Sequence, residues 1–440
     1  MTTSAPITER RYIVPLAMVT SLFFVWAIGV NLNDVLIQHM KKAFGLTDFQ
    51  SSFIQFAFFG GYFLAAFPAG WIMQRIGYKR GILVGLLVCA TGTILFIPAA
   101  SVRIYAFFLV ALFIMACGQS VLEVAANPYV TTLGPAESSE RRLNLAQSFN
   151  ATGAFLVAIL GSKFILSGIE YAPAQQAAMS ATQLLNYRIS EANMVKMPYV
   201  VITGIFLFIG VLIFSTKLPE IQEASEVGST DTSSTDANIK VAGTLAFSHL
   251  LKGVVAQFCY VGAQVGVASF IIRFSEFTLA GTHEKAAARF LQFHLLGFML
   301  GRFSGSGIMR KIAPSRLLSI FAAGSLLCLT VILLSSGMSA VVAIIALGFF
   351  HSIMFPTIFA LSIKNLGPYT KLGSSFLVMS IIGGALVPMM MGRISDAWNI
   401  QRAFLVPLLC HAYVFYFALR GYRPIQATTP ALAGTAGEIQ

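Results

Sequence analysis

Two acidic residues lie inside strongly apolar stretches of the chain, and they are the residues best able to do chemistry. Asp34 lies in the first such stretch, three residues after Asn31, and Glu123 lies in the fourth, four residues before Asn127. A carboxylate at mid-bilayer costs roughly 2.5–3.5 kcal/mol on insertion scales, so acids at such positions are rare and functional. In a membrane protein they are typical of sites that carry a proton, an ion or a polar solute.

The composition indicates that these acids lie in a membrane. Of the 440 residues, 57% are hydrophobic and 10% are charged, whereas soluble domains are about 25% charged. Apolar stretches of about 20 residues, the length that crosses the hydrocarbon layer, recur along the chain. Because lipid offers no partners to the backbone, the spans must be helices. We predict an all-α membrane protein with twelve transmembrane helices, at 12–38, 52–74, 80–99, 104–133, 144–167, 197–216, 249–275, 285–309, 315–336, 339–363, 373–392 and 402–420.

The net charge of +12 does not indicate a nucleic-acid partner. Lys and Arg residues alternate between the connections that join the spans, as the positive-inside rule predicts. The larger share falls on the side of the N-terminus, so we expect both termini in the cytoplasm and a multi-pass protein of the bacterial inner membrane. We expect a monomer whose partners are the lipid bilayer and a small molecule.

The chain divides into two similar halves. Residues 217–246 break the apolar pattern with a polar, Ser- and Thr-rich run and are predicted to be a cytoplasmic linker. It separates an N-terminal six-helix bundle (1–216) from a C-terminal one (247–423), and residues 424–440 are predicted to be a disordered tail. Pro128 and Pro356, in the fourth and tenth spans, are each followed by Leu-Gly-Pro. Two parallel repeats of six spans are the major facilitator architecture.

Polar residues inside the spans recur at helical spacing. Gln119, Glu123 and Asn127 follow one another in steps of four, and the fifth span carries Gln147 and Asn150 three residues apart. Such stripes would waste hydrogen bonds against lipid, so we expect them to face a water-filled cavity. At 1.5 Å per residue, Glu123 and Asn150 lie about 15 and 12 Å from the cytoplasmic surface, with Asp34 about one turn further out. These depths favour a solute-binding site at the level of Glu123 and Asn150, next to a distinct protonation site at Asp34.

Structural interpretations of the same residues stay open. A polar residue in a span can simply link two helices, and Asp34 could be a buried acid paired with Arg302. Arg302 itself is expected to anchor the cytoplasmic half of its own helix. His294 and His351 could titrate near neutral pH, although a hydrogen-bonded cavity histidine is the more economical interpretation. No Cys or His residues have the spacing of a metal site.

Longer blocks of sequence resemble one known family. They are Asn31-Leu-Asn-Asp34, Leu122-Glu-Val-Ala-Ala-Asn127-Pro128, Arg142-Leu-Asn-Leu-Ala-Gln147-Ser-Phe-Asn150, Gln257-Phe-Cys-Tyr260-Val-Gly-Ala-Gln264, Pro356-Thr-Ile-Phe359 and Ile363–Phe376. Over residues 12–423 the chain is similar to the L-fucose–proton symporter family of the major facilitators. The resemblance implies a proton-coupled importer of L-fucose or a related hexose that works by alternating access.

The resemblance also implies residue roles. It makes Asp34 the proton-coupling residue, with Glu123 in the sugar cavity and able to titrate with Asp34. The matching substrate-binding candidates are Asn31, Glu123, Gln147, Asn150, Tyr260, Gln264, His351 and Phe355. Phe355 replaces a tyrosine of the fucose symporters, whereas Gln264 matches them and differs from the Glu of several glucose, galactose or N-acetylglucosamine carriers.

Other functions remain as alternatives. A sodium-coupled glucose/galactose or N-acetylhexosamine symporter of the same family would also use a carboxylate with Asn neighbours, so sodium stays open as the co-transported ion in place of H+. The resemblance implies no cofactor. A membrane-embedded enzyme using His351 and Asp34 is disfavoured because the repeated halves are typical of transporters, and a passive carrier would differ only in lacking coupling.

Overall fold

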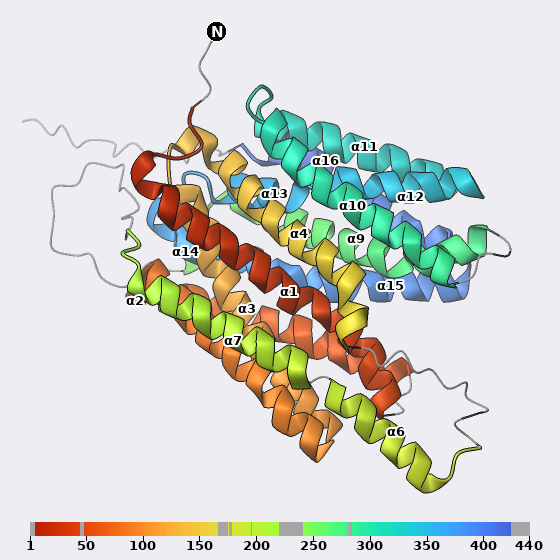
Figure 1. Cartoon of the computed structure of the whole chain (residues 1–440). Coiled ribbons are helices and arrows are strands. Elements are labelled where there is room, and N and C mark those ends of the chain that lie inside the picture. Colours follow the sequence, from red (N-terminus) through yellow and green to blue (C-terminus); the bar gives the residue numbers. More distant parts are fainter. Residues whose placement is uncertain are drawn as a thin grey trace, which may run out of the picture.

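The computed structural model describes residues 5–44, 48–165, 175, 178–194, 196–219, 241–279, 281 and 284–423. The side chains of residues 32–43 and of a few other helical residues also lie outside this description. Within these ranges all regular elements are helical, as the all-α prediction requires (Figure 1). Most of the predicted linker (220–240) and the predicted tail (424–440) lie outside the described residues, so their assignment stays a prediction.

The helices of the first half, here called the N-half, are α1 (Ile13–Phe44), α2 (Asp48–Val102), α3 (Tyr105–Thr132), α4 (Ser139–Ile165), α6 (Ala181–Met194) and α7 (Lys196–Ser215). Those of the second half, the C-half, are α8 (Val241–Leu245), α9 (Ser248–Thr278), α10 (Glu284–Ile308), α11 (Pro314–Leu334), α12 (Met338–His351), α13 (Met354–Ile363), α14 (Thr370–Met379), α15 (Gly383–Ala397) and α16 (Leu405–Tyr416). Short 3-10 turns join several of them, and a π-helical turn, η6 (Phe417–Gly421), follows α16.

These helices supply the twelve predicted crossings. Ten described segments are long and apolar enough to span a membrane, and one of them, Phe53–Val102, is 50 residues long. At 1.5 Å per residue this segment is more than twice the bilayer core, so it makes two crossings. Gly77, with φ 78°, breaks the helix between them, in a left-handed conformation that favours glycine. The twelfth crossing is the 25-residue α10, whose Arg289, His294 and Arg302 lower its hydropathy.

Two predicted spans are interrupted. The tenth is broken at Ser352 and Ile353, between α12 and α13, and the eleventh is broken at η4 (Ser380–Ile382), between α14 and α15. In addition, α6 precedes the sixth span, and α8 lies inside the predicted linker. The predicted linker therefore contains a short helix near its end.

Small residues allow the helices of each half to approach closely. A Cβ added to Gly92 or Gly118 would overlap atoms of Met115 or Cys89, which lie across the contact between α2 and α3. Close backbone approach at glycine is a common way for transmembrane helices to associate. This packing holds the third and fourth crossings of the N-half together.

The two halves meet through α4, which packs against α10 and α13, and through α2, which packs against α14 and α15. Many of these contacts lie toward the end of the molecule that carries Ser215 and Val241, which we call the linker end. The ring of Phe67 lies 6.1 Å from that of Phe376, and the Lys371 ammonium lies 5.1 Å from the ring of Tyr78. Toward the opposite end, which carries Phe44 and Val102, the halves diverge in the view of Figure 1.

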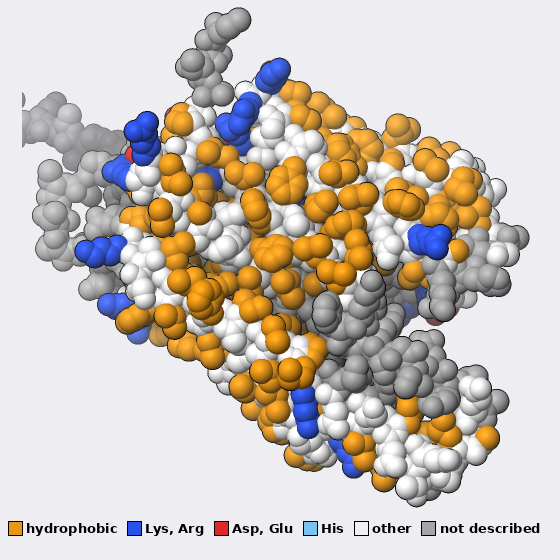
Figure 2. Space-filling model, viewed as in Figure 1, with side chains coloured by type: hydrophobic (Ala, Val, Ile, Leu, Met, Phe, Trp, Pro, Cys, Tyr) orange, Lys and Arg blue, Asp and Glu red, His pale blue; other side chains and the backbone are white. Residues whose placement is uncertain are grey.

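The surface has the pattern of a membrane protein. Large apolar side chains such as Trp71, Phe208 and Leu327 are half or more exposed. Figure 2 shows apolar side chains over the middle of the molecule and Lys and Arg mainly toward its two ends. A broad exposed apolar belt of this kind matches the hydrocarbon layer of a bilayer.

Candidate functional site

Glu123 lies at the buried centre of the N-half, on α3. Only 5% of the residue is exposed, and Asn127 is buried one turn further along the same helix. The Asn127 carbonyl oxygen accepts a hydrogen bond of 3.1 Å from the amide of Gln147 on α4. The spacing of four residues therefore places an acid and an amide on one face, and α4 extends that face with a second amide.

Arg302 reaches this polar group from the C-half. Its Nη1 donates to the backbone oxygen of Gln147 at 2.6 Å and to the side-chain oxygen at 3.0 Å, and it lies 3.5 Å from Oδ1 of Asn150. The guanidinium also lies 4.5 Å from the centre of the Phe298 ring. A buried cation needs such partners, and Arg302 interacts electrostatically with Glu123. The N-half and C-half are thereby joined at the depth of the predicted sugar level.

Arg302 also compensates for the break in the tenth span. Pro356 has no N–H, so the backbone oxygen of Ser352, four residues earlier, loses its helical donor. The Nε of Arg302 donates to that oxygen at 2.9 Å. The neighbouring oxygen of His351 accepts from the hydroxyl of Tyr260 at 2.9 Å. Two side chains thus satisfy backbone oxygens that an unbroken helix would have paired.

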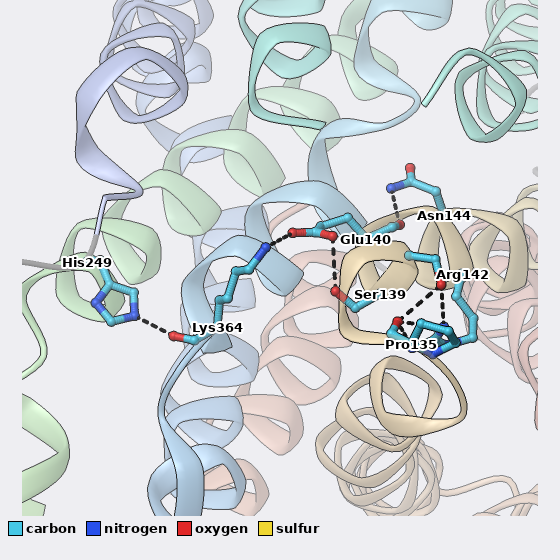
Figure 3. A network of polar contacts seen from close by, with 8 residues as sticks. Pro135, Ser139, Glu140, Arg142, Asn144, His249 and Lys364 are labelled. Carbon is cyan, nitrogen blue, oxygen red and sulfur yellow. Dashed lines mark hydrogen bonds and ion pairs between the residues drawn. The ribbon is translucent and has the colours of Figure 1, made fainter. Parts of the chain in front are cut away.

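Polar contacts between α4 and the C-half, here called the α4 seam, join the two halves at the linker end. Glu140 forms an ion pair of 3.0 Å with Lys364, the residue that follows α13 (Figure 3). Asn144 donates to the hydroxyl of Thr357 at 3.0 Å. Glu140, Asn144 and Gln147 lie four and three residues apart, so one face of α4 carries all three contacts to the C-half. We expected the polar stripe that includes Gln147 to face water, yet in this state it is packed against the C-half.

The start of α4 is anchored by Arg142, which is fully buried. Its guanidinium donates to the backbone oxygen of Val130 in the last turn of α3 at 2.7 Å. It also donates to that of Pro135, in the α3–α4 connection, at 3.3 Å (Figure 3). It also donates to the oxygen of Ile7 in the N-terminal segment at 2.8 Å. Arg142 therefore fixes the turn from which the α4 seam starts.

The remaining predicted site residues are placed less centrally. Asn31 is half-buried, and its amide donates to the oxygen of Ala27 in the same helix at 2.7 Å. Phe355 is buried and stacks on Phe359. Gln264 is half-buried on α9, just over one turn beyond Tyr260. The side chain of Asp34 lies outside the described residues, although its backbone belongs to α1.

Two features of this site were not predicted from the sequence. Arg302 was expected to anchor its own helix, whereas its guanidinium bridges α4 and the break of the tenth span. His411, which is buried beside His351, was not among the predicted site residues. A signal for Arg302 was present, because an arginine among apolar residues on α10 requires a buried partner.

Comparison with known proteins identifies the family of this chain. The family model described as Major Facilitator Superfamily matches residues 18–388. The chain belongs to the Major Facilitator Superfamily. Within it, the chain is 42% identical to the L-fucose-proton symporter of Escherichia coli, over 93% of each protein. It is 41% identical to the glucose/galactose transporter of Brucella abortus biovar 1, over 94% of this chain and 95% of the relative.

A solved structure agrees with the fold of this major facilitator. The crystal structure of the transporter FucP in the outward conformation superimposes with a TM-score of 0.84 at 41% sequence identity. The match covers 93% of this chain and 99% of that one. The predicted fold, two six-helix bundles of the major facilitator type, is confirmed.

The candidate site offers polar groups to a ligand. Glu123, Asn127, Gln147 and Asn150 offer hydrogen-bonding atoms, and Arg302 offers a cation, at the boundary between two bundles. Their arrangement suits recognition of a polyhydroxylated solute. The protein is a transporter and not an enzyme, as its family requires.

Proposed function

We propose that this protein is a proton-coupled symporter that imports a hexose or 6-deoxyhexose, such as L-fucose, across the bacterial inner membrane with both termini in the cytoplasm. The observation that carries the proposal is the buried polar group of Glu123, Asn127 and Gln147, which Arg302 joins to the C-half. The names of the relatives support the class of substrate.

We assign the sugar to the polar boundary between the halves. Glu123, Gln147 and Asn150 would accept and donate hydrogen bonds to its hydroxyls from the N-half. Asn31 would contact the sugar or a bound water, and Tyr260, Gln264, His351 and Phe355 would complete the site from the C-half, with rings able to stack on a sugar face. Arg302 contacts the side-chain oxygens of Gln147 and Asn150, so a sugar that binds these oxygens would compete with the guanidinium.

We assign the coupling proton to Asp34, with Glu123 as the second acid. Burying an unpaired charge between two closing bundles is costly, so reorientation is favoured once the acid is neutral. One proton moving through about 100 mV supplies about 2.3 kcal/mol, enough for roughly 40-fold accumulation of sugar. Release on the linker side then requires the α4 seam to separate.

The test is transport by Asp34→Asn in proteoliposomes. This variant carries a permanently neutral side chain, so it should exchange sugar across the membrane yet fail to concentrate it against a gradient. Asp396→Asn, at an exposed carboxylate of α15, is the matched control and should keep uphill uptake. If Asp34→Asn still accumulates sugar against its gradient, Asp34 is not the coupling residue.

A further inference from the structure

A cluster of three histidines lies in the interior of the C-half. His294 on α10, His351 at the end of α12 and His411 on α16 are all buried, with 2% or less of each exposed. The rings of His351 and His411 are stacked, with centroids 4.8 Å apart and planes 8° apart. The ring of His294 lies 5.9 Å from that of His351. Three buried imidazoles are an unusual use of an otherwise apolar core.

Two of these rings are held by backbone oxygens. Nδ1 of His294 lies 2.8 Å from the oxygen of Ile344, and Nδ1 of His411 lies 2.8 Å from that of Pro407. A carbonyl oxygen can only accept, so both Nδ1 atoms carry the hydrogen. In the neutral rings, Nε2 is then an acceptor. For His411, this Nε2 is buried and has no partner among the described residues.

His351 and Gln257 add further unused atoms. Both ring nitrogens of His351 are buried without a partner in the described part of the chain, and so are both polar atoms of the Gln257 amide. Gln257 lies one turn before Tyr260 on α9, which packs against α12, α13 and α16. Buried polar groups are normally paired, so a group of unpaired ones indicates a ligand or ordered water.

This cluster borders the proposed sugar site. Tyr260 donates to the backbone oxygen of His351, and Arg302 donates to that of the next residue, Ser352. Tyr260 also lies beside the break between α12 and α13. Interrupted helices near mid-membrane are where transporters of this kind place their substrates. The cluster is therefore connected, through Tyr260 and the break between α12 and α13, to the boundary between the halves.

The unused atoms define the chemistry of the ligand. Nε2 of His411 and Oε1 of Gln257 accept, whereas the Gln257 amide nitrogen and one nitrogen of His351 donate. A metal cation would leave the donors unpaired. Among the described residues, no three His, Cys, Asp or Glu side chains are placed to hold a metal ion together. A methyl group would pair with none of them. A hydroxyl both donates and accepts, so it matches the set.

We propose that His351, His411 and Gln257 form a subsite that recognises one hydroxyl group of the transported sugar and so helps to set which hexoses are accepted. This inference rests on the proposed function and adds the C-half determinant of its specificity. A site built to pair with a hydroxyl discriminates strongly against an analogue that lacks it, because its buried polar groups are then left unpaired.

The experiment pairs a set of deoxy sugars with substitutions in the cluster. Competition against labelled sugar in counterflow would be measured for the parent hexose and for its 2-, 3-, 4- and 6-deoxy forms, the galactose and fucose pair of the same hand giving the 6-position. The proteins are the wild type, His411→Phe, His351→Asn and Gln257→Leu. His351→Asn keeps a polar group, so it tests the subsite even where a larger change prevents folding.

At one position, removing the hydroxyl should weaken binding to the wild type by roughly tenfold to a hundredfold. The same removal should change binding to His411→Phe or Gln257→Leu by less than about threefold. Equal losses in the wild type and every variant at all positions would mean that the cluster holds only water, and would overturn the proposal. Failure of all hexoses to compete with the wild type would instead contradict the proposed function.

Discussion

Arg302 of the C-half donates to both the backbone oxygen and the side-chain oxygen of Gln147 in the N-half, at 2.6 and 3.0 Å. The same guanidinium donates to the backbone oxygen of Ser352 at the break of the tenth span. One side chain therefore connects the boundary between the halves with an interrupted helix. Separation of the linker end requires these bonds to break, so Arg302 is placed to link reorientation to events in the site.

Arg302→Lys should slow transport while the protein still folds. Lysine keeps the charge but lacks the planar fork that contacts Ser352 and Gln147 together. Hydrogen bonds to charged groups are worth about 1.5–3 kcal/mol, so we expect the rate of counterflow to fall by about tenfold or more. Arg289→Lys, at an exposed position of the same helix, is the control. Equal rates for both variants would show that the fork has no part in transport.

The Glu140–Lys364 ion pair should stabilise the closed linker end. Lys364 is about half exposed, so solvent screens the pair and we expect a coupling of at most about 1 kcal/mol. Glu140→Gln should raise the labelling of a cysteine placed behind the seam by roughly twofold to fivefold. The exposed Glu137→Gln should not change it. Restoration by the exchanged pair Glu140→Lys with Lys364→Glu would confirm a direct contact, and no change in any variant would exclude it.

Glu123→Ala should weaken sugar binding. The change removes a nearly fully buried carboxylate one helical turn from Asn127. Loss of the hydrogen bond that this charged group would make to the sugar corresponds to roughly tenfold to a hundredfold in affinity. Calorimetric titration of the purified protein measures this directly, with Glu137→Ala as the control. An unchanged dissociation constant would remove Glu123 from the site.

Gly118→Leu should disrupt the N-half. Even a Cβ at this position overlaps the backbone and thiol of Cys89 across the α2–α3 contact, and overpacking of this size typically costs 1–3 kcal/mol or more. We expect a lower unfolding temperature in detergent. Gly60→Ala, where an added Cβ meets nothing within 4 Å, is the control. Equal unfolding temperatures would mean that the helices can move apart at no cost.

Much of the fold could be predicted because the bilayer imposes a length on each helix. The two crossings merged in α2 were separable from the sequence, because basic residues and Gly77 interrupt the apolar run. The eighth span was predicted despite Arg289 and Arg302, since its apolar residues still reach the required length. The spacing of Glu123 and Asn127 likewise predicted that they share a helix face, and both are buried on α3.

The contacts between the halves could not be predicted in the same way. Arg302 and Gln147 lie 155 residues apart, and their pairing depends on how two bundles dock rather than on any local periodicity. The cluster around His351 was hidden for a similar reason, because His411 comes from the last span. The break beside His351 was foreseeable in principle, since Pro356 removes a helical hydrogen bond.

The most direct test of proton-coupled sugar import is the pH change that a substrate hexose evokes in lightly buffered proteoliposomes without sodium. The account predicts that adding sugar alkalinises the external medium as protons enter with it, and that Asp34→Asn abolishes this signal while sugar exchange continues. Sugar accumulation that requires a sodium gradient and leaves the external pH unchanged would contradict it.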